Sequence, residues 1–349
     1  MPLIGATGMA YVLPLAFSAP GIMPRPGKGC GWCGQFDGST NMDDVTKSPT
    51  ETLAPEDVAA LRAAVPSADA ARATLAGQGW DVLAWRVPAP DGDWLLRVPR
   101  LPEAILTIEG QHRLTEALRG KGVPLPREPR LLRGRGGEVV AGLYRFVDGR
   151  EARARGRAAR RQLAAAIAEL VSTLHALGPS VGIACGAVPY VPWEDLFKPM
   201  IERCAPLLSP TTEAWVREVG SRLARASRTL PPLTLVHADL KPAHVLLHEG
   251  GEILALLDFE SARVSDPALE FSRLIQNWDE AFASMVLRLY RGPVDEGFMV
   301  RARCYCALDP LEGLDISIRR GWPEWPPIVR RILAARAGAA TRQRQRREG

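Results

Sequence analysis

The chain has 349 residues, of which 46% are hydrophobic and 24% are charged, and these proportions are ordinary for a globular protein of one two-lobed domain or two domains. No apolar run reaches the roughly 18 residues that a membrane helix needs, so no membrane partner is expected. The positive charges that give a net +5 gather in Arg-dense stretches at 149–161 and 334–349. A nucleic-acid-binding function rests only on these stretches, which lack interleaved aromatic residues and are typical of solvated helix faces.

Residues 1–50 are rich in Gly, Pro, Ser and Thr and are predicted to be a disordered leader. Their apolar start has no Lys or Arg before the apolar run and is interrupted by Pro14, which argues against a signal sequence. Cys30 and Cys33 form a C-x-x-C pair, but Gly residues surround it and no second ligand pair has matching spacing. We therefore expect free thiols and a cytoplasmic protein.

Residues 51–147 are predicted to form a small, strand-rich lobe that binds the nucleotide. Its elements are expected in chain order as helices up to about Gly77, a β-hairpin over 80–100, a helix over 102–122 and a second hairpin over 129–149. The second hairpin ends in a strand through Tyr144 and Phe146.

Residues 148–337 are predicted to form a larger, mainly helical lobe, followed by a basic tail at 338–349. Apolar residues at helical spacing indicate helices over 160–178, 193–207, 211–228, 267–290, 297–320 and 325–337. One strand-like island interrupts them at 233–261 and contains "LVHADLKPAHVLLHEGGEILALLDFES".

The island places two acids, Asp239 and Asp258, at the ends of apolar runs that would form neighbouring strands. Two such acids repel each other unless a cation lies between them or they have separate tasks. Transfer of a γ-phosphoryl group needs this division of tasks, because one Asp accepts the proton of the nucleophile and another binds the metal that bridges the phosphates. A further metal ligand follows the catalytic Asp by five residues in such enzymes, and here that residue is His244.

These residues resemble the aminoglycoside/macrolide phosphotransferase family, the antibiotic kinases with a protein-kinase-like fold. The family pattern H-G-D-L-x-x-x-N, followed by I-D-W/F and D-P, is matched at His237, Asp239, Leu240, Asp258, Phe259, Asp266 and Pro267. The resemblance covers roughly 55–335 and implies an α+β fold of two lobes. It implies that Asp239 is the catalytic base and Asp258 a metal ligand. His237 would brace the loop, and Asp266 would bind backbone amides of the catalytic loop as a helix cap.

His244 departs from the family pattern because it stands where the usual residue is Asn. Mg²⁺ prefers oxygen ligands, whereas imidazole suits softer ions such as Mn²⁺ and Zn²⁺. His244 could bind the metal through nitrogen, contact it through water, weaken metal binding or be structural. The macrolide phosphotransferases also carry His here, so the sequence looks closest to that branch.

Arg97 is a second departure, since protein kinases have a Lys on the third strand. Arg can make bidentate contacts to phosphate, so the role is kept chemically. Its expected partner is Glu109 on the next helix, with Glu116 in reserve, and an exposed hairpin Arg is the alternative. The nucleotide base is expected to hydrogen-bond the connector at 144–148.

The resemblance implies ATP or GTP as the phosphoryl donor, Mg²⁺ or Mn²⁺, and a small-molecule acceptor. Trp278 and Asp279 are candidate acceptor contacts, within a mixture of aromatic and acidic residues. A macrolide-like acceptor is favoured over an aminoglycoside because of His244, and other small-molecule hydroxyls stay open. A monomer or weak dimer is expected. The alternative is a pseudokinase, a nucleotide-binding scaffold in which His244 reflects lost metal binding.

Overall fold

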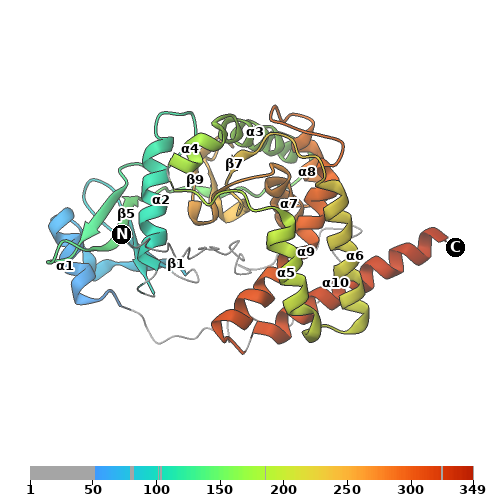
Figure 1. The fold of residues 1–349 in the computed structure, drawn as a ribbon. Helices are drawn as coiled ribbons and strands as arrows, with labels where there is room; N and C mark the ends of the chain where they lie inside the picture. The colour runs from blue at the N-terminus through green and yellow to red at the C-terminus, as the bar shows by residue number, and fades with distance from the viewer. Residues whose placement is uncertain are drawn as a thin grey trace, which may run out of the picture.

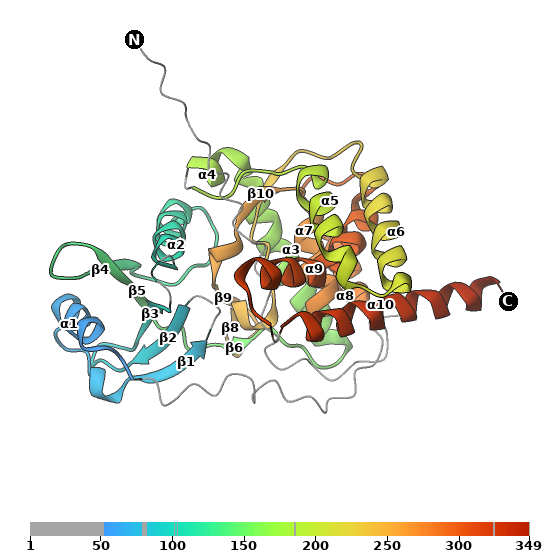
Figure 2. The same cartoon turned by 60° about the horizontal axis from the view of Figure 1, so that its bottom comes forward.

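The computed structural model describes residues 52–78, 82–100, 102, 104–184, 186–323 and 325–348. The predicted leader at 1–50 and the Cys30/Cys33 pair lie outside the described residues. The chain folds into a part that contains a large sheet and a mainly helical part, which lie side by side in both views (Figures 1 and 2).

The first part is a five-stranded antiparallel sheet with the strand order β1-β2-β3-β5-β4. Its strands are β1 (Thr74–Gln78), β2 (Val82–Val87), β3 (Trp94–Pro99), β4 (Arg130–Arg133) and β5 (Val139–Arg145). Side chains alternate across the sheet, so Trp85, Leu96 and Leu143 lie in register on one face and share a buried cluster with Leu61 of α1 (Pro55–Ala64).

The opposite face of this sheet carries α2 (Ala104–Leu118). A Cβ added to Gly142 of β5 would lie 3.0 Å from Ile108 of α2, so the missing side chain allows the helix to approach the strand closely. Arg97 pairs with Gly142 across β3 and β5 and therefore lies on the same face as α2. The sheet thus presents Arg97 beside α2.

The second part contains eight α-helices among the described residues. They are α3 (Arg157–Ala176), α4 (Gly178–Ala184), α5 (Trp193–Cys204), α6 (Pro210–Ala226), α7 (Ala268–Asn277), α8 (Glu280–Leu287), α9 (Phe298–Arg320) and α10 (Trp325–Glu348). Helix α7 is buried from Ala268 to Ile275. None of the described helices has by itself the length and apolar composition to cross a membrane. Helices α3 and α4 meet these two criteria only when they are taken together, and they are bent by 72° where they meet.

Short strands within the second part carry the island that the sequence singled out. Strand β7 (Thr234–Val236) pairs with β10 (Arg263–Ser265), and a second small sheet has the order β6-β8-β9. The latter strands are β6 (Arg150–Glu151), β8 (Val245–Leu247) and β9 (Ile253–Leu256). The 3₁₀ turns η4 (Pro242–His244) and η5 (Phe259–Ser261) flank this sheet, and η2 (Ala70–Arg72) and η3 (Ala205–Leu207) lie elsewhere.

Helix α9 contains Pro310, which has no N–H and so cannot bond the carbonyl four residues earlier. That carbonyl belongs to Cys306, and Arg336 of α10 donates to it from Nη1 at 2.5 Å and to the carbonyl of Ala307 at 3.3 Å. The first part of α10 therefore supplies the hydrogen bond that Pro310 removes. The far end of α10 projects from the body of the molecule in both views (Figures 1 and 2).

Three sequence-based element predictions need correction. The helices expected up to Gly77 end earlier, because Thr74–Gln78 pairs with β2 as strand β1. The single helix expected over 267–290 is two helices, because Trp278 leaves the helical conformation and the Asp279 side chain accepts from the backbone N–H of Phe282 at 2.7 Å, which starts α8. The helix expected over 325–337 continues through the basic tail to Glu348 as α10.

Candidate active site

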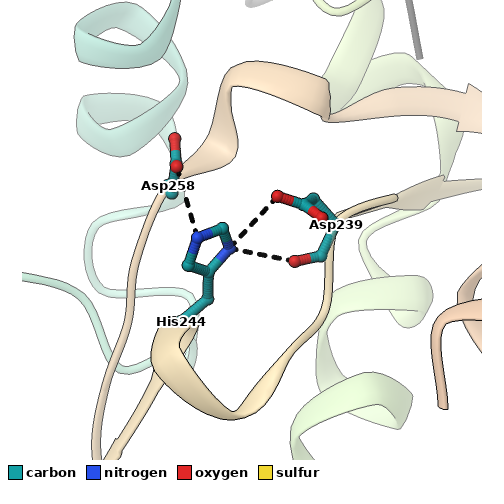
Figure 3. Close-up of side chains that lie close together, drawn as sticks. All are labelled: Asp239, His244 and Asp258. Carbon is teal, nitrogen blue, oxygen red and sulfur yellow. Dashed lines mark hydrogen bonds and ion pairs between the residues drawn. The ribbon is translucent and has the colours of Figure 1, made fainter. Parts of the chain in front are cut away.

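Three side chains converge where the small strands end. Asp239 follows β7, His244 closes η4 and leads into β8, and Asp258 follows β9. The potential ligand atoms of these three residues all lie within 4.8 Å of one another. Figure 3 shows the His244 ring between the two carboxylates. The structure therefore brings together the three residues that the sequence pattern singled out.

The contacts of His244 determine which tautomer its ring adopts. Its Nδ1 lies 2.9 Å from the carbonyl oxygen of Asp239, which can only accept, so Nδ1 carries the hydrogen (Figure 3). Burial lowers the pKa of His244 to about 4, so the ring is neutral near pH 7 and Nε2 has a lone pair. This Nε2 faces Oδ2 of Asp258 at 3.3 Å. A cation bound between them would stabilise these two acceptors, Nε2 of His244 and Oδ2 of Asp258.

Asp258 offers further room for a cation. Its Oδ1 is buried and has no hydrogen-bond partner within the described part of the chain, although Nη2 of Arg97 lies 3.5 Å away. Burial opposes ionisation of Asp258, but the positively charged groups around it, Arg97 above all, outweigh the effect of burial and lower its pKa. Asp258 has a φ of +62°, a conformation that costs a non-glycine residue energy. Two carboxylates and a neutral imidazole fit a divalent ion, with a softer donor set than Mg²⁺ prefers.

The Asp239 carboxylate is held in place with its side chain only 6% exposed. Its Oδ2 accepts a hydrogen bond from Nζ of Lys241 at 3.0 Å. The preceding Ala238 has a φ of +64°, where the family pattern has Gly. The His237 ring donates from Nε2 to the carbonyl of Leu257 at 2.8 Å, and its Nδ1 accepts from the backbone N–H of Asp239 at 3.3 Å. His237 therefore joins the segments that carry Asp239 and Asp258.

One face of α7 holds the backbone of the loop around Asp239. Glu270 accepts from the backbone N–H of His237 at 2.7 Å, and Arg273 donates from Nε to the carbonyl of Ala238 at 2.7 Å. Asn277 donates from Nδ2 to the carbonyl of Leu240 at 2.9 Å. The three residues are spaced i, i+3 and i+7, which places them on one side of the helix. Sequence reasoning missed them, although three polar residues at this helical spacing were a visible signal.

The predicted role of Asp266 needs correction in one part, its contact with amides of the catalytic loop. Its Oδ1 caps α7 by accepting from the backbone N–H of Ala268 at 3.1 Å, as expected of a capping Asp. Its remaining contacts are with Arg301, whose Nε donates to Oδ2 at 2.6 Å, and with the hydroxyl of Tyr305 at 3.2 Å. Among the described side chains, the carboxylate that accepts from an amide of the catalytic loop is Glu270, one turn further along α7.

The predicted partner of Arg97 is also wrong. Arg97 donates from Nη1 to Gln111 of α2 and from Nη2 to Glu260 of η5. Glu109 is not one of its partners, and the reserve candidate Glu116 pairs with Arg119 at the surface. Burial alone would lower the pKa of Arg97, but Glu260 and Asp258 raise it above the usual range. Arg97 is therefore a buried cation beside Asp258, not an exposed hairpin residue.

Tyr144 and Phe146 lie at the end of β5 and just beyond it. Tyr144 is 3% exposed, and burial raises the pKa of its hydroxyl to about 12. It shares the sheet face of Arg97, because it pairs with Leu95 and lies two residues from Gly142. The backbone N–H of Phe146 donates to the carbonyl of Asp93 at 3.0 Å, and the Arg86 guanidinium lies 4.3 Å from the Phe146 ring centre. Their nucleotide contacts stay predictions.

Comparison with known proteins decides the family. The model of the phosphotransferase enzyme family, abbreviated APH, matches residues 72–299. The chain belongs to this family. The expected family is thus confirmed. A curated relative, the uncharacterized protein YcbJ of Bacillus subtilis (strain 168), is 35% identical over 60 residues, which are 14% of this chain and 20% of YcbJ. The chain therefore spans about one fifth of the length of this relative.

Solved APH-type structures share the fold of this APH chain. The GDP complex of wild-type aminoglycoside 2'-phosphotransferase-IIIa has a TM-score of 0.69 and 21% identity, over 80% of this chain and 97% of that chain. Macrolide 2'-phosphotransferase MphH from Brachybacterium faecium has a TM-score of 0.60 and 21% identity, over 81% and 98%. The gentamicin complex of APH(2")-IIa has a TM-score of 0.64 and 14% identity, over 82% and 99%. The expected α+β, protein-kinase-like fold of two lobes is confirmed.

Trp278 and Asp279 of this APH chain have structural partners. Trp278 donates from Nε1 to the carbonyl of Ala152 at 3.0 Å and stacks on Phe282. Asp279 caps α8 and accepts from Nη2 of Arg160 at 2.8 Å. A role of either residue in acceptor binding stays a prediction.

Acidic residues of α9 are paired inside this APH chain. Asp309 accepts from Arg273, and Asp315 accepts from Arg203 at 2.7 Å and from Arg319 at 2.9 Å. Asp309 and Asp315 are buried. Their charges are therefore used to neutralise arginines rather than offered to a cationic ligand.

Proposed function

We propose that the protein transfers the γ-phosphoryl group of ATP or GTP to a hydroxyl of a small molecule. The observation that carries this proposal is the convergence of Asp239, His244 and Asp258 in a chain of the phosphotransferase enzyme family. Asp239 is assigned as the base that accepts the proton of the acceptor hydroxyl. Its buried carboxylate is oriented by Lys241 and by the backbone contacts of α7, so it is positioned before the acceptor arrives.

Asp258 and His244 are the residues that would hold a divalent ion, Mg²⁺ or Mn²⁺. When bound, such an ion would neutralise charge on the phosphate oxygens of the nucleotide. Arg97 lies on the sheet side of Asp258 and would add a second positive charge for the phosphates. Tyr144 and the connector that follows it are the proposed neighbours of the nucleotide base.

An antibiotic is the acceptor class that we favour, with a macrolide-like molecule ahead of an aminoglycoside. Both kinds of phosphotransferase are among the solved structures that share this fold, and one of these contains kanamycin. A polycationic acceptor needs unpaired acids, whereas Asp309 and Asp315 are already paired with arginines. His244 points in the same direction, because the macrolide branch resembles this chain at that position. We place the enzyme in the cytoplasm as a monomer or weak dimer.

The decisive experiment is phosphoryl transfer from radiolabelled ATP and GTP, with Mg²⁺ or Mn²⁺, to a panel of macrolides, aminoglycosides and other hydroxyl compounds. Asp239→Asn should abolish transfer while it leaves nucleotide binding intact, because it removes the base and not the nucleotide contacts. Asp69→Asn, an exposed acid of the first part of the chain, is the matched control and should be fully active. Nucleotide binding without transfer to any acceptor would favour the pseudokinase or a kinase of a non-antibiotic metabolite.

A further inference from the structure

Arg97 lies between the two parts of the chain and is bound from both sides. Nη1 donates to Gln111, which belongs to α2 beside the large sheet, and Nη2 donates to Glu260, which belongs to η5 in the second part. The Arg97 side chain is 11% exposed and that of Glu260 is 22% exposed. A buried guanidinium needs a charged partner, because an unpaired buried charge is strongly destabilising.

The helix beside the sheet gives Arg97 no charge, since Gln111 is neutral. The acids that the structure places next to Arg97 are Glu260 and Asp258, and both follow β9 in the second part of the chain. Asp258 is the proposed metal ligand, and its Oδ2 faces Nε2 of His244 on the other side at 3.3 Å. Glu260 is therefore the acid available to orient Arg97 while Asp258 serves the metal.

We propose that Glu260 is a positioning residue for Arg97 in phosphoryl transfer. Glu260 holds the Arg97 guanidinium against η5, next to Asp258. The guanidinium is therefore oriented toward the phosphate site before the nucleotide binds. Because Glu260 belongs to η5, the Arg97 guanidinium keeps this orientation only while η5 lies against α2 and the sheet. The two parts of the chain must therefore be closed on each other for Arg97 to act. This inference rests on the proposed function.

A purely structural ion pair would give a different result from a positioning role. Loss of a structural pair lowers the stability of the protein and leaves the affinity of the folded protein for nucleotide unchanged. Loss of a positioning residue weakens nucleotide binding and slows transfer in protein that is still folded. Gln111 and Glu260 contact different nitrogens of the Arg97 guanidinium. A carboxylate placed at position 111 should therefore restore nucleotide binding in a protein that has lost the carboxylate of Glu260.

The test is a charge exchange between the two partners in the full-length protein. The variants are Glu260→Gln, Gln111→Glu and the double variant, and the exposed Glu252→Gln is the matched control. Binding of Mg²⁺-ADP and Mg²⁺-GDP is measured by calorimetry, together with KM for the nucleotide and kcat. Glu260→Gln should weaken binding about tenfold. Gln111→Glu should also weaken binding about tenfold, because a second acid over-neutralises Arg97. The double variant should return to within about threefold of the wild type.

Several outcomes would overturn the inference. One is Glu260→Gln protein that binds both nucleotides as tightly as the wild type and turns over at the same rate. Another is a double variant that binds no better than the weaker single variant. If Glu260→Gln does not fold, Glu260→Asp, which withdraws the carboxylate by one methylene, takes its place with the same expected loss. Wild-type protein that binds neither nucleotide would overturn the proposed function as well, which separates the two failures.

Discussion

Arg273 reaches from α7 to the carbonyl oxygen of Ala238 at 2.7 Å, and Ala238 directly precedes Asp239. The same guanidinium is paired with Asp309 of α9, and the two side chains are 1% and 5% exposed. The position of the proposed base therefore depends on a buried ion pair between two helices that the sequence analysis had not connected with catalysis.

Replacement of Arg273 should separate stability from catalysis. Arg273→Met leaves Asp309 as an unpaired buried charge, and we expect a loss of about 3–5 kcal/mol in the free energy of unfolding. Arg273→Met combined with Asp309→Leu should recover most of this loss, since no unpaired charge remains. The double variant should still have a kcat reduced by about tenfold or more, because the Ala238 carbonyl has lost its donor. Urea unfolding and steady-state kinetics would check this, and a double variant with wild-type kcat would contradict it.

Ala238→Gly should stabilise the protein. Ala238 has a φ of +64°, where glycine is not strained, so we expect a gain of about 0.5–1 kcal/mol in the free energy of unfolding. The control is Ala262→Gly, a buried alanine with a φ of −59°, for which we expect a loss of about 0.5–1 kcal/mol. Chemical denaturation of the two variants side by side is the measurement, and equal losses in both would disprove the prediction.

His244→Asn should change the metal preference. An amide oxygen replaces an imidazole nitrogen, so the ratio of activity with Mg²⁺ to activity with Mn²⁺ should rise about tenfold. His248→Asn is the control, because the side chain of His248 is 62% exposed and lies outside the site. Activity titrations with both ions would measure the ratio. An unchanged ratio would mean that His244 does not contact the metal.

Asp57 gives a pH dependence of stability that is separate from the site. Burial, aided by the charge of Glu56, raises the pKa of Asp57 to about 6. Between about pH 4 and pH 6 the folded protein keeps a proton that the unfolded chain releases, so this residue makes stability fall as the pH rises. Asp57→Asn should therefore stabilise the protein by about 1–3 kcal/mol at pH 7, and by much less near pH 4. Unfolding at both pH values would test this, and a gain that is the same at both would refute it.

The fold and the three central residues could be predicted because their signals are local. The hairpin over 80–100 is marked by the turn residues Asp91 and Gly92, and β2 and β3 form as expected. Asp239, His244 and Asp258 lie at fixed spacings around short apolar runs, and strand pairing brings such positions together. A local pattern also placed Asp266 at the start of α7, where its Oδ1 caps the helix.

The partners of these residues could not be predicted, because they depend on packing between segments far apart in the sequence. Arg97 and Glu260 are 163 residues apart, and nothing near Arg97 distinguishes a partner on α2 from one on η5. Glu270 and Asp266 are both acids at the start of α7, and the distance to the loop decides which one accepts from His237. The break between α7 and α8 also involves a contact between distant segments, since the Trp278 indole donates from Nε1 to the carbonyl of Ala152.

The hydrogen bonds from α7 to the loop around Asp239 have a consequence for local motion. The carbonyls of Ala238 and Leu240 are bound by Arg273 and Asn277, and α7 itself is buried from Ala268 to Ile275. The loop therefore cannot open without breaking contacts to a core helix, so its opening should require nearly the whole free energy of unfolding. In hydrogen–deuterium exchange, the amides of this loop should behave like those of the core helices and unlike those of ordinary surface loops.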